Sequence, residues 1–416
     1  MRGRRFIYLG LCASVGAALW SSSGCSAASR DQQAPGAVGV GGGGGATSAT
    51  TAEAGAGGGS AGASSGVDFG HGGAPSSEPE QRDDDGDGFT VEDGDCNDDD
   101  ANVNPGALEV AITEPDDAGV VPEPADEDCD GEIDNLLPTC DRNIAPADFD
   151  AMHGARAVDL CAKASPGDRR WGVLSAEYVR GDGSRAEPTP AVGVLDSFGP
   201  NVHVQGGDRM LVLSTGRARI AHWPGACNTP DCTNYGPGEA PPGFPQDNPD
   251  CPPSSNINDD IGLELVIRTP TNATGYEFAF KFYTFEYPEF ICDHFNDQFL
   301  ALATPAPPGS LNGNLSFDSL GNPVSVNIGF FDVCEGCDRG ADELEGTGFG
   351  LWDDAGATGW LRTQAPVKGG EELKLRFMIF DTGDERLDST ALVDGFKWVA
   401  NGGTVAVGTA PVEDPQ

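Results

Sequence analysis

Closely spaced aspartates in two short stretches have the residue type and spacing of calcium ligands. In the first stretch, Asp83, Asp85 and Asp87 occupy positions 1, 3 and 5 of a loop. Gly88, at position 6, permits a sharp turn, and the carbonyl of Phe89 at position 7 would add an oxygen. Calcium binds six to eight hard oxygen ligands, several of them anionic, on a backbone that wraps around the ion. This stretch is therefore predicted to bind calcium.

The end of the first stretch departs from an EF-hand loop. An EF-hand places a bidentate acid at position 12, where this chain has Gly94. Asp95 and Asp98 follow directly and could complete the ligand shell. We therefore predict a calcium loop without the flanking helices of an EF-hand.

The second stretch repeats the spacing further along the chain. Asp126, Asp128 and Asp130 stand at positions 1, 3 and 5. Gly131 again occupies the turn position, and Asp134 stands at position 9. The repeated pattern predicts a second calcium site.

Each aspartate stretch contains a cysteine, Cys96 in the first and Cys129 in the second. A disulfide between them would hold two ligand arcs together in a segment too polar to form a core. The alternative interpretation is an acidic solvated linker, which charge runs usually are. The same spacing occurs twice, each time with glycine at the turn, so we favour metal binding with Ca²⁺ as the cofactor.

Four motifs in residues 83–135 resemble a known repeat. They are Asp-Gly-Asp-Gly-Phe, Asp-Gly-Asp-Cys-Asn-Asp, Asn-Pro-Gly-Ala and Asp-Cys-Asp-Gly-Glu-Ile-Asp. Together they resemble the MopE-type metal-binding repeat of bacterial surface proteins and, more loosely, the thrombospondin type-3 calcium repeats. The stretch between Val110 and Asp126 replaces a shorter connection that usually carries a further Cys. Copper would need His, Met or Cys ligands, and the segment has no His or Met.

The region after the acidic segment has the pattern of β-strands. Apolar and polar side chains alternate, which places the apolar set on one face of each strand. Strands are expected at 171–179, 210–214, 261–267, 276–282, 298–303, 324–331, 373–379 and 391–399. Short strands between Gly, Pro and Asn loops predict an all-β fold, a β-sandwich or jelly-roll-like domain.

Two parts of this region lack the strand pattern. Residues 147–162 have the only plausible helical pattern. Residues 224–253 contain three cysteines and many prolines, and are expected to form a disulfide-pinned surface loop.

Six short motifs in the β region resemble the choice-of-anchor L domain. They lie at 286–290, 295–299, 359–361, 370–371, 381–384 and 387–389. The resemblance covers residues 165–399. It implies an exported protein held to cells by one of several sorting devices, and it gives location and not chemistry, because the ligand of such domains is not established.

Two sets of oxygen-bearing side chains in the β region could form a further metal cage. They are Glu286, Glu289, Asn296 and Asp297, and Asp381, Asp384, Asp388 and Asp394. Each is as easily a set of turn caps and loop hydrogen bonds, so both interpretations stay open. Paired carboxylates could also serve a glycosidase, but acids are too abundant here for pairing to be informative.

The N-terminus predicts export. Arginines precede an apolar run over 6–20, and small residues lead to Cys25. The run is too short to be a comfortable membrane span. We predict a signal peptide over 1–24 and lipidation of Cys25, whose context resembles a bacterial lipobox; the alternative is cleavage near Ala27 and release. The expected location is the outer membrane or cell surface.

Residues 25–82 are mostly Gly, Ala, Ser and Thr, and cannot bury enough surface to fold. As a flexible coil this tether would span on the order of 40 Å. The predicted organisation is a signal peptide (1–24), a disordered tether (25–82), an Asp-rich metal-binding repeat (83–135) and a β-sandwich domain (136–411).

Cysteine usage agrees with export. Of 12 cysteines, Cys12 leaves with the signal and Cys25 would carry lipid, so ten remain. An even number in an exported chain predicts five disulfides. Cys334 and Cys337 form a CxxC motif, for which a loop disulfide is favoured over a redox site because the following residues do not suggest a helix start.

The net charge of the chain limits the classes of molecule that it is expected to bind. The chain has 24 Lys plus Arg against 66 Asp plus Glu, a formal charge of -42. Nucleic acid and anionic membrane surfaces are electrostatically poor partners, and divalent cations are the natural counter-ions. Membrane contact is expected through the lipid anchor alone.

Motifs of catalysis are absent from the sequence. It contains no HExxH and no P-loop, and strings of the form Gly-x-Ser-x-Gly or Gly-x-Gly-x-x-Gly occur only in the Gly-rich stretch 25–82, which lacks the strand and helix patterns of a nucleophile elbow or a Rossmann fold. We therefore predict a non-enzyme: a cell-surface, calcium-binding structural or adhesion-type protein that presents a β-sandwich to a surface polysaccharide or another surface protein. The alternative is a secreted polysaccharide hydrolase with a calcium-stabilised appendage.

Overall fold

Two antiparallel sheets form the β region. The first has the order β1 (Gly172–Val179), β4 (Ile257–Arg268), β11 (Glu372–Thr382), β6 (Gln298–Thr304) and β7 (Val324–Ser325). The second has the order β13 (Gly408–Pro411), β10 (Leu361–Pro366), β5 (Ala273–Thr284), β12 (Ser389–Ala400), β3 (Met210–Ser214) and β2 (Val192–Leu195). The short strand β9 (Gly356–Thr358) pairs with β5 and with β8 (Phe331–Val333).

This architecture comes from a computed structural model that describes residues 81–111, 121, 123–218, 226–227, 229–352, 354–400 and 405–412. The predicted signal peptide, the lipidation site Cys25 and nearly all of the predicted tether lie outside the described residues. Within the described residues, no helix is long and apolar enough to cross a membrane.

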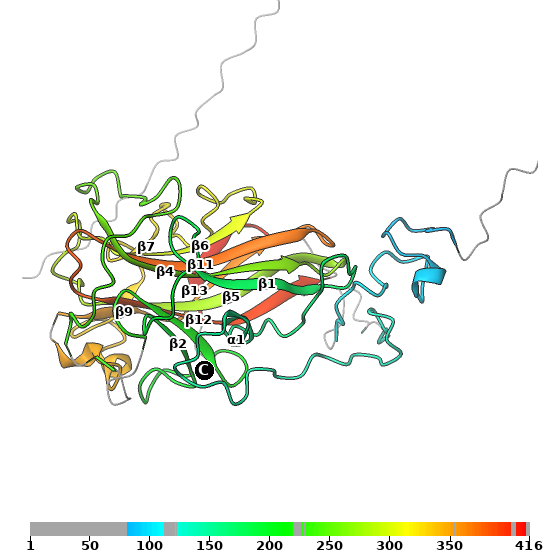
Figure 1. The fold of residues 1–416 in the computed structure, drawn as a ribbon, viewed down its shortest axis with the longest axis horizontal. Helices are drawn as coiled ribbons and strands as arrows, with labels where there is room; N and C mark the ends of the chain where they lie inside the picture. Colours follow the sequence, from blue (N-terminus) through cyan, green and yellow to red (C-terminus); the bar gives the residue numbers. More distant parts are fainter. Residues whose placement is uncertain are drawn as a thin grey trace, which may run out of the picture. The chain divides into compact units, whose positions relative to one another are not determined.

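Side chains alternate between the two faces of each long strand, so the apolar ones gather in one core between the two sheets. Phe278 and Phe280 of β5 are fully buried and point to the same side, as period two requires. Phe278 meets Phe377 of β11 with ring centroids 5.0 Å apart, and Phe280 meets Phe299 of β6 at 5.1 Å. Figure 1 shows β4, β11 and β6 layered on β5 and β12. The predicted all-β sandwich is confirmed.

The long predicted strands are present, and the short ones are less well predicted. β4, β5 and β11 each contain the alternating run expected for them. The single strand expected over 324–331 is wrong, because the amide of Ile328 donates to the Ser325 carbonyl (3.1 Å) and turns the chain between β7 and β8. The pattern also misses β2, β9, β10 and β13, which are too short or too mixed in composition to stand out.

The helical pattern yields a shorter helix than expected. Helix α1 covers Ala151–Arg156, and its N-cap Asp150 accepts from the amide of Met152 at 2.9 Å. A Cβ on Gly154 would lie 2.5 Å from the Tyr178 hydroxyl, so glycine is what lets the helix pack closely on β1. Short helical turns also occur among the described residues at η2 (Val91–Asp93), η3 (Asp342–Leu344) and η4 (Phe349–Leu351).

Disulfides pair all ten cysteines that the sequence leaves for bonding. The pairs are Cys96–Cys129, Cys140–Cys161, Cys227–Cys232, Cys251–Cys292 and Cys334–Cys337. The five expected disulfides are confirmed, as is the loop disulfide in the CxxC motif. The described part of 224–253 contains no strand and is held by two of these pairs, as expected.

Candidate metal centre

The first aspartate loop gathers the side chains that its spacing predicts. One carboxylate oxygen from each of Asp83, Asp85 and Asp87 lies within 4.8 Å of the others. Asp83 fixes the turn, because its carboxylate accepts from the amides of Gly86 (2.6 Å) and Gly88 (3.0 Å). Both glycines have positive φ, 84° and 97°, a backbone conformation that favours glycine.

Asp85 and Asp87 each accept a hydrogen bond from a backbone amide through one carboxylate oxygen, and the other oxygen of each is free. Asp85 Oδ1 accepts from the amide of Asp87 (3.1 Å), and Asp87 Oδ1 accepts from the amide of Phe89 (2.7 Å). Oδ2 of Asp85 and Oδ2 of Asp87 are buried atoms without a hydrogen-bond partner. Two anionic oxygens are therefore free for a cation.

The residues expected to complete the shell join the same group. One oxygen from each of Asp85, Asp95 and Asp98 lies within 4.8 Å of the others. Asp95 is only 4% exposed, and its Oδ2 also lacks a partner. Asp98 Oδ1 accepts from the amide of Asp84 (3.0 Å), which ties the two ends of the loop together.

Phe89 contributes its ring to this site in a way the sequence does not suggest. The ring is 5% exposed, and the guanidinium of Arg169 lies 4.6 Å from its centroid. The ligand role predicted for its carbonyl stays a prediction.

The second aspartate stretch forms two groups, both of which include glutamates that the spacing does not single out. Oxygens of Asp126, Asp128 and Glu109 lie within 4.8 Å of one another, and so do oxygens of Asp134, Glu109 and Glu127. Glu109 and Glu127 are 6% and 5% exposed. Glu109 Oε2 and Asp134 Oδ1 are buried without partners. The acid at 109 stands in the otherwise apolar run 107–110, which is the one sequence signal that marks it.

The turn of the second aspartate stretch resembles the turn of the first, but the carboxylate of Asp130 has different hydrogen-bond partners from its counterpart, Asp87. Asp126 accepts from the amides of Asp130 (3.1 Å) and Gly131 (3.0 Å). Asp130 accepts from the amide of Glu132 (2.8 Å) and from the side-chain amide of Asn135 (2.8 Å). Both oxygens of Asp130 are therefore engaged by donors, and Glu109 takes the place by Asp126 and Asp128 that the spacing gives to Asp130.

The disulfide Cys96–Cys129 links the two aspartate stretches, as expected. A further link runs through the backbone, where the amide of Asn104 donates to the Glu127 carbonyl at 2.8 Å. The amide of Asp128 donates to Glu109 Oε1 at 3.0 Å. The stretches are thus cross-linked by a covalent bond and by hydrogen bonds.

The acidic segment also contacts the turn between β4 and β5. The amide of Thr271 donates to the Gly106 carbonyl (2.9 Å), and Asn272 exchanges two hydrogen bonds of 2.9 Å with the backbone of Leu108. A Cβ on Gly106 would lie 3.0 Å from the Thr271 methyl group, so the close approach favours glycine. Arg169 adds an ion pair with Asp93 at 2.5 Å.

Electrostatics in the segment disfavour the bare carboxylates. Burial, reinforced by neighbouring carboxylates, raises the pKa of Asp87 to about 6 and raises the pKa values of Asp85, Asp95 and Asp128. No Lys or Arg occurs in the sequence between Asp83 and Asp134. The charged form of these groups therefore lacks a compensating cation from the segment itself.

The β region brings together only part of each acid set named from the sequence. Glu286, Asp297 and Asp381 are 1%, 0% and 2% exposed, and burial, reinforced by the charge of another member of the group, raises the pKa of each. Glu289 is exposed at the surface. Asp394 lies elsewhere, where its carboxylate accepts from the amides of a loop on the other side of β12.

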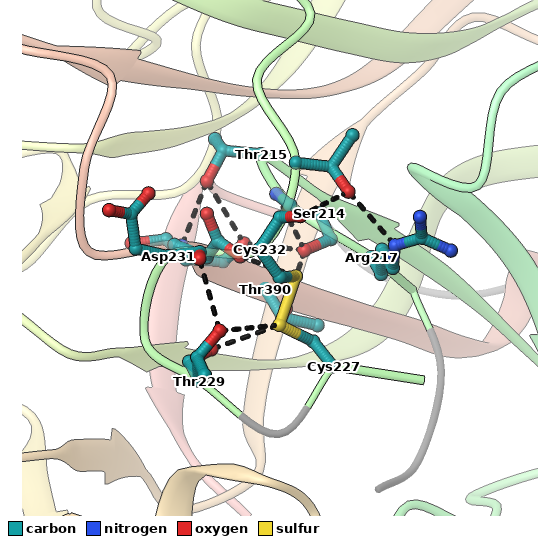
Figure 2. Close-up of a disulfide and its surroundings, with 12 residues drawn as sticks. Ser214, Thr215, Arg217, Cys227, Thr229, Asp231, Cys232 and Thr390 are labelled. Atoms are coloured by element: carbon teal, nitrogen blue, oxygen red, sulfur yellow. Dashed lines mark hydrogen bonds between the residues drawn. A yellow bond between two sulfur atoms is a disulfide. The ribbon is translucent and has the colours of Figure 1, made fainter. Parts of the chain in front are cut away.

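A further cluster surrounds the disulfide Cys227–Cys232, which Figure 2 shows beside Ser214, Thr215 and Thr390. An oxygen of Asp388 lies within 4.8 Å of both sulfur atoms. Because the sulfurs are bonded to each other, they are not thiolates and offer a cation little. Burial raises the pKa of Asp388 to about 8.

No family model matches the chain, and neither a curated protein nor a solved structure matches it. The resemblances to the MopE-type repeat and to the choice-of-anchor L domain stay predictions.

Proposed function

We propose that the chain is an exported, calcium-binding structural protein of the cell surface. In this proposal residues 83–135 bind Ca²⁺ at two oxygen-lined sites, and the β-sandwich presents its loops to a surface polysaccharide or another surface protein. The observation that carries the proposal is the set of buried carboxylate oxygens without partners, in a segment whose sequence contains no cationic side chain.

The donor set favours calcium over other ions. Every grouped ligand atom in the segment is a carboxylate oxygen. Such donors suit calcium, magnesium and manganese, whereas zinc and copper prefer nitrogen and sulfur. Calcium accepts a large and irregular oxygen shell, while magnesium demands a near-ideal octahedron and keeps several waters. Loops that combine carboxylates with turn backbone fit the calcium pattern better.

The role of the ions would be mechanical. Gly106 and Leu108 of the segment hydrogen-bond to the sandwich, and Phe89 of the segment packs against Arg169. The bound ions would hold both aspartate loops in the conformation that makes these contacts. Extracellular modules bind calcium at about 10⁻⁴ to 10⁻³ M. Calcium outside the cell would therefore keep the segment ordered next to the sandwich. The lipid anchor at Cys25 and the tether belong to the same proposal and rest on the sequence alone.

Calcium titration of the full chain, followed by calorimetry, tests the proposal. Asp87→Asn and Asp128→Asn each replace a charged ligand by an amide of the same shape, so each is expected to remove one bound ion. The matched control is Asp99→Asn, an exposed aspartate of the same segment that belongs to neither group. Unchanged isotherms for both site variants would refute the proposal.

The hydrolase alternative has one observation in its favour. A cavity of about 720 Å³ is lined by Arg180, Asp182, Glu187, Tyr235 and Asp259, among others. Carboxylates beside an aromatic ring could bind a sugar. Asp259 is already engaged, since it accepts from the amides of Tyr235 and Gly236, so we place this function second. Release of reducing sugar from a polysaccharide panel would reverse that order.

A further inference from the structure

The disulfide Cys227–Cys232 places both of its sulfur atoms close to hydrogen-bond acceptors. Cys232 Sγ lies 3.0 Å from Asp388 Oδ2, and Cys227 Sγ lies 2.9 Å from the carbonyl oxygen of Thr229. If the bond between the cysteines were reduced, each new thiol would have an acceptor already in place. Such acceptors stabilise the reduced form, and a disulfide whose reduced form is stabilised is easier to reduce.

Other disulfides of the chain have looser surroundings at sulfur. The sulfur–oxygen contacts measure 3.6 Å for Cys96, 3.7 Å for Cys292 and 3.6 Å for Cys334. All three contacts are to backbone carbonyls, and none of them involves a titratable side chain. The surroundings of Cys227–Cys232 therefore differ both in distance and in chemistry.

The packing around Asp388 holds its carboxyl beside Cys232. The residue is 7% exposed. A Cβ on Gly216 would collide with Asp388 Oδ2, so glycine at position 216 is what lets the carboxyl reach the disulfide. The backbone amide of Asp388 donates to the carbonyl of Pro230 at 2.8 Å, which fixes residue 388 against the loop that the disulfide closes.

The carboxyl of Asp388 holds a proton in this arrangement. A disulfide sulfur has no hydrogen to donate, so the hydrogen bond between Asp388 and Cys232 is donated by the carboxyl. Burial raises the pKa of Asp388 to about 8, the amide of Cys232 opposes this shift, and the charges of Asp231 and Asp259 add to it. The proton is therefore present at neutral pH, next to the sulfur that would need it.

The titratable groups around Asp388 are mostly acids, which favour its neutral form. Some act on its pKa, others respond to its charge, and one lines a small cavity beside it. They are Asp231, Asp259, Asp297, Asp381, Tyr235 and Arg217.

The two sulfur atoms differ in access to solvent. Figure 2 shows the contacts of Cys227 with Thr229, an exposed residue, whereas Cys232 contacts the buried Asp388. A cavity of about 20 Å³ lies against Cys227, Asp388 and Arg217. It gives the sulfur atoms room to separate in a close-packed interior. A reagent from solvent would therefore attack Cys227, and Cys232 would be the leaving group.

We propose that Cys227–Cys232 is a thiol–disulfide exchange site with Asp388 as its proton donor, and that its co-reactant is a dithiol from outside the chain. One thiolate of the dithiol bonds to Cys227 Sγ while the bond between the cysteines breaks. The electron pair leaves with Cys232 Sγ, which takes the proton of Asp388. The second thiolate of the dithiol then attacks the mixed disulfide and releases Cys227, which takes a proton from water. The cysteine pair gains two electrons, and the dithiol is oxidised to a disulfide.

Redox titration of the full chain tests the first part of this proposal. The folded protein, in saturating Ca²⁺, is equilibrated with increasing ratios of reduced to oxidised dithiothreitol, and free thiols are alkylated and located by peptide mass spectrometry. The matched control is Cys334–Cys337, which also closes a short loop, with a sequence separation of 3 against 5. Cys227–Cys232 should open at a ratio on the order of tenfold lower than the control, the factor that one or two hydrogen bonds gained on reduction would give.

The rate of reduction tests the role of Asp388. At pH 6, Asp388→Asn should slow reduction of Cys227–Cys232 by about 100-fold, as expected for loss of a general acid. Asp384→Asn, which changes an exposed acid of the same loop, should leave the rate unchanged. Divided by the concentration of reductant thiolate, the wild-type rate should be constant below about pH 8 and fall above it, where Asp388 loses its proton. In Asp388→Asn the same quotient should not change with pH.

Three results would overturn the proposal. They are opening of Cys227–Cys232 together with or after Cys334–Cys337, an unchanged rate in Asp388→Asn, and a wild-type quotient that does not fall above pH 8. If Asp388→Asn does not fold, the wild-type pH profile decides the role of Asp388. None of these measurements depends on the calcium sites, so their failure leaves the proposed function untouched.

Discussion

The acidic segment and the β-sandwich both collect carboxylates, but they rest on different physics. The segment buries few apolar side chains, chiefly Phe89, Val103 and Ala107, and its loops are shaped by carboxylates that accept backbone amides. The sandwich is shaped by a continuous apolar core, and its acids lie at the end of that core. Cations should therefore be needed to form the segment and should only reinforce the sandwich.

The largest expected effect is a dependence of the stability of the sandwich on pH. Burial raises the pKa values of Asp388 and Asp394 to about 8, against 3.8 for an unperturbed aspartate. The folded state therefore holds protons that the unfolded state releases, and stability is full below about pH 4 and falls as pH rises toward 8. At 1.4 kcal/mol per unit, the loss for one such group is on the order of 5 kcal/mol.

Chemical denaturation at pH 5 and pH 8, with and without calcium, measures this effect. The protein should be more stable at pH 5 than at pH 8, and calcium should leave this difference in place, because neither Asp388 nor Asp394 belongs to a proposed calcium site. Equal stability at both pH values would contradict the raised pKa values of these two acids in the folded protein.

A smaller loss of stability is expected from truncating a side chain in the apolar core. Phe377→Ala removes a fully buried ring that packs on Phe278, and should cost about 3–5 kcal/mol of sandwich stability. The loss should be the same with and without calcium, because no acid of the segment contacts this ring. Denaturation curves in both conditions provide the check, and a calcium-dependent loss would break the division between the two regions.

Removal of the disulfide in the acidic segment should have the smallest effect on the stability of the whole chain. Cys96→Ser/Cys129→Ser opens a loop with a sequence separation of 33 residues, which corresponds to about 3–4 kcal/mol of chain entropy. The loss should fall on the segment, so limited proteolysis should cut within 83–135 while the melting of the sandwich stays the same. Cleavage that begins in the sandwich strands would argue that the two regions are one cooperative unit.

Local spacing predicts a site better than it predicts which distant residues join it. The positions of Asp83, Asp85 and Asp87 follow from a single loop, so spacing alone groups them. Glu109 reaches the second site only because a disulfide and the Asn104–Glu127 hydrogen bond bring two stretches together, and such contacts leave little trace in the sequence.

The sandwich shows the same limit. Alternation predicts the long strands and therefore which face each side chain occupies, including the inward face of Asp297. It does not predict that β6 lies beside β11, so it cannot group Asp297 with Asp381. Cages inferred from acids that are close in sequence accordingly group Glu289 and Asp394 with residues from which the fold separates them.

Hydrogen exchange of the segment amides, with and without calcium, tests the central claim most directly. The amides of Gly86, Gly88 and Gly131 donate to Asp83 and Asp126, the first residues of the two loops. If calcium organises these loops, saturating Ca²⁺ should slow exchange at these amides while the amides of β5 and β11 stay protected in both conditions. Exchange at equal rates with and without calcium would contradict the account.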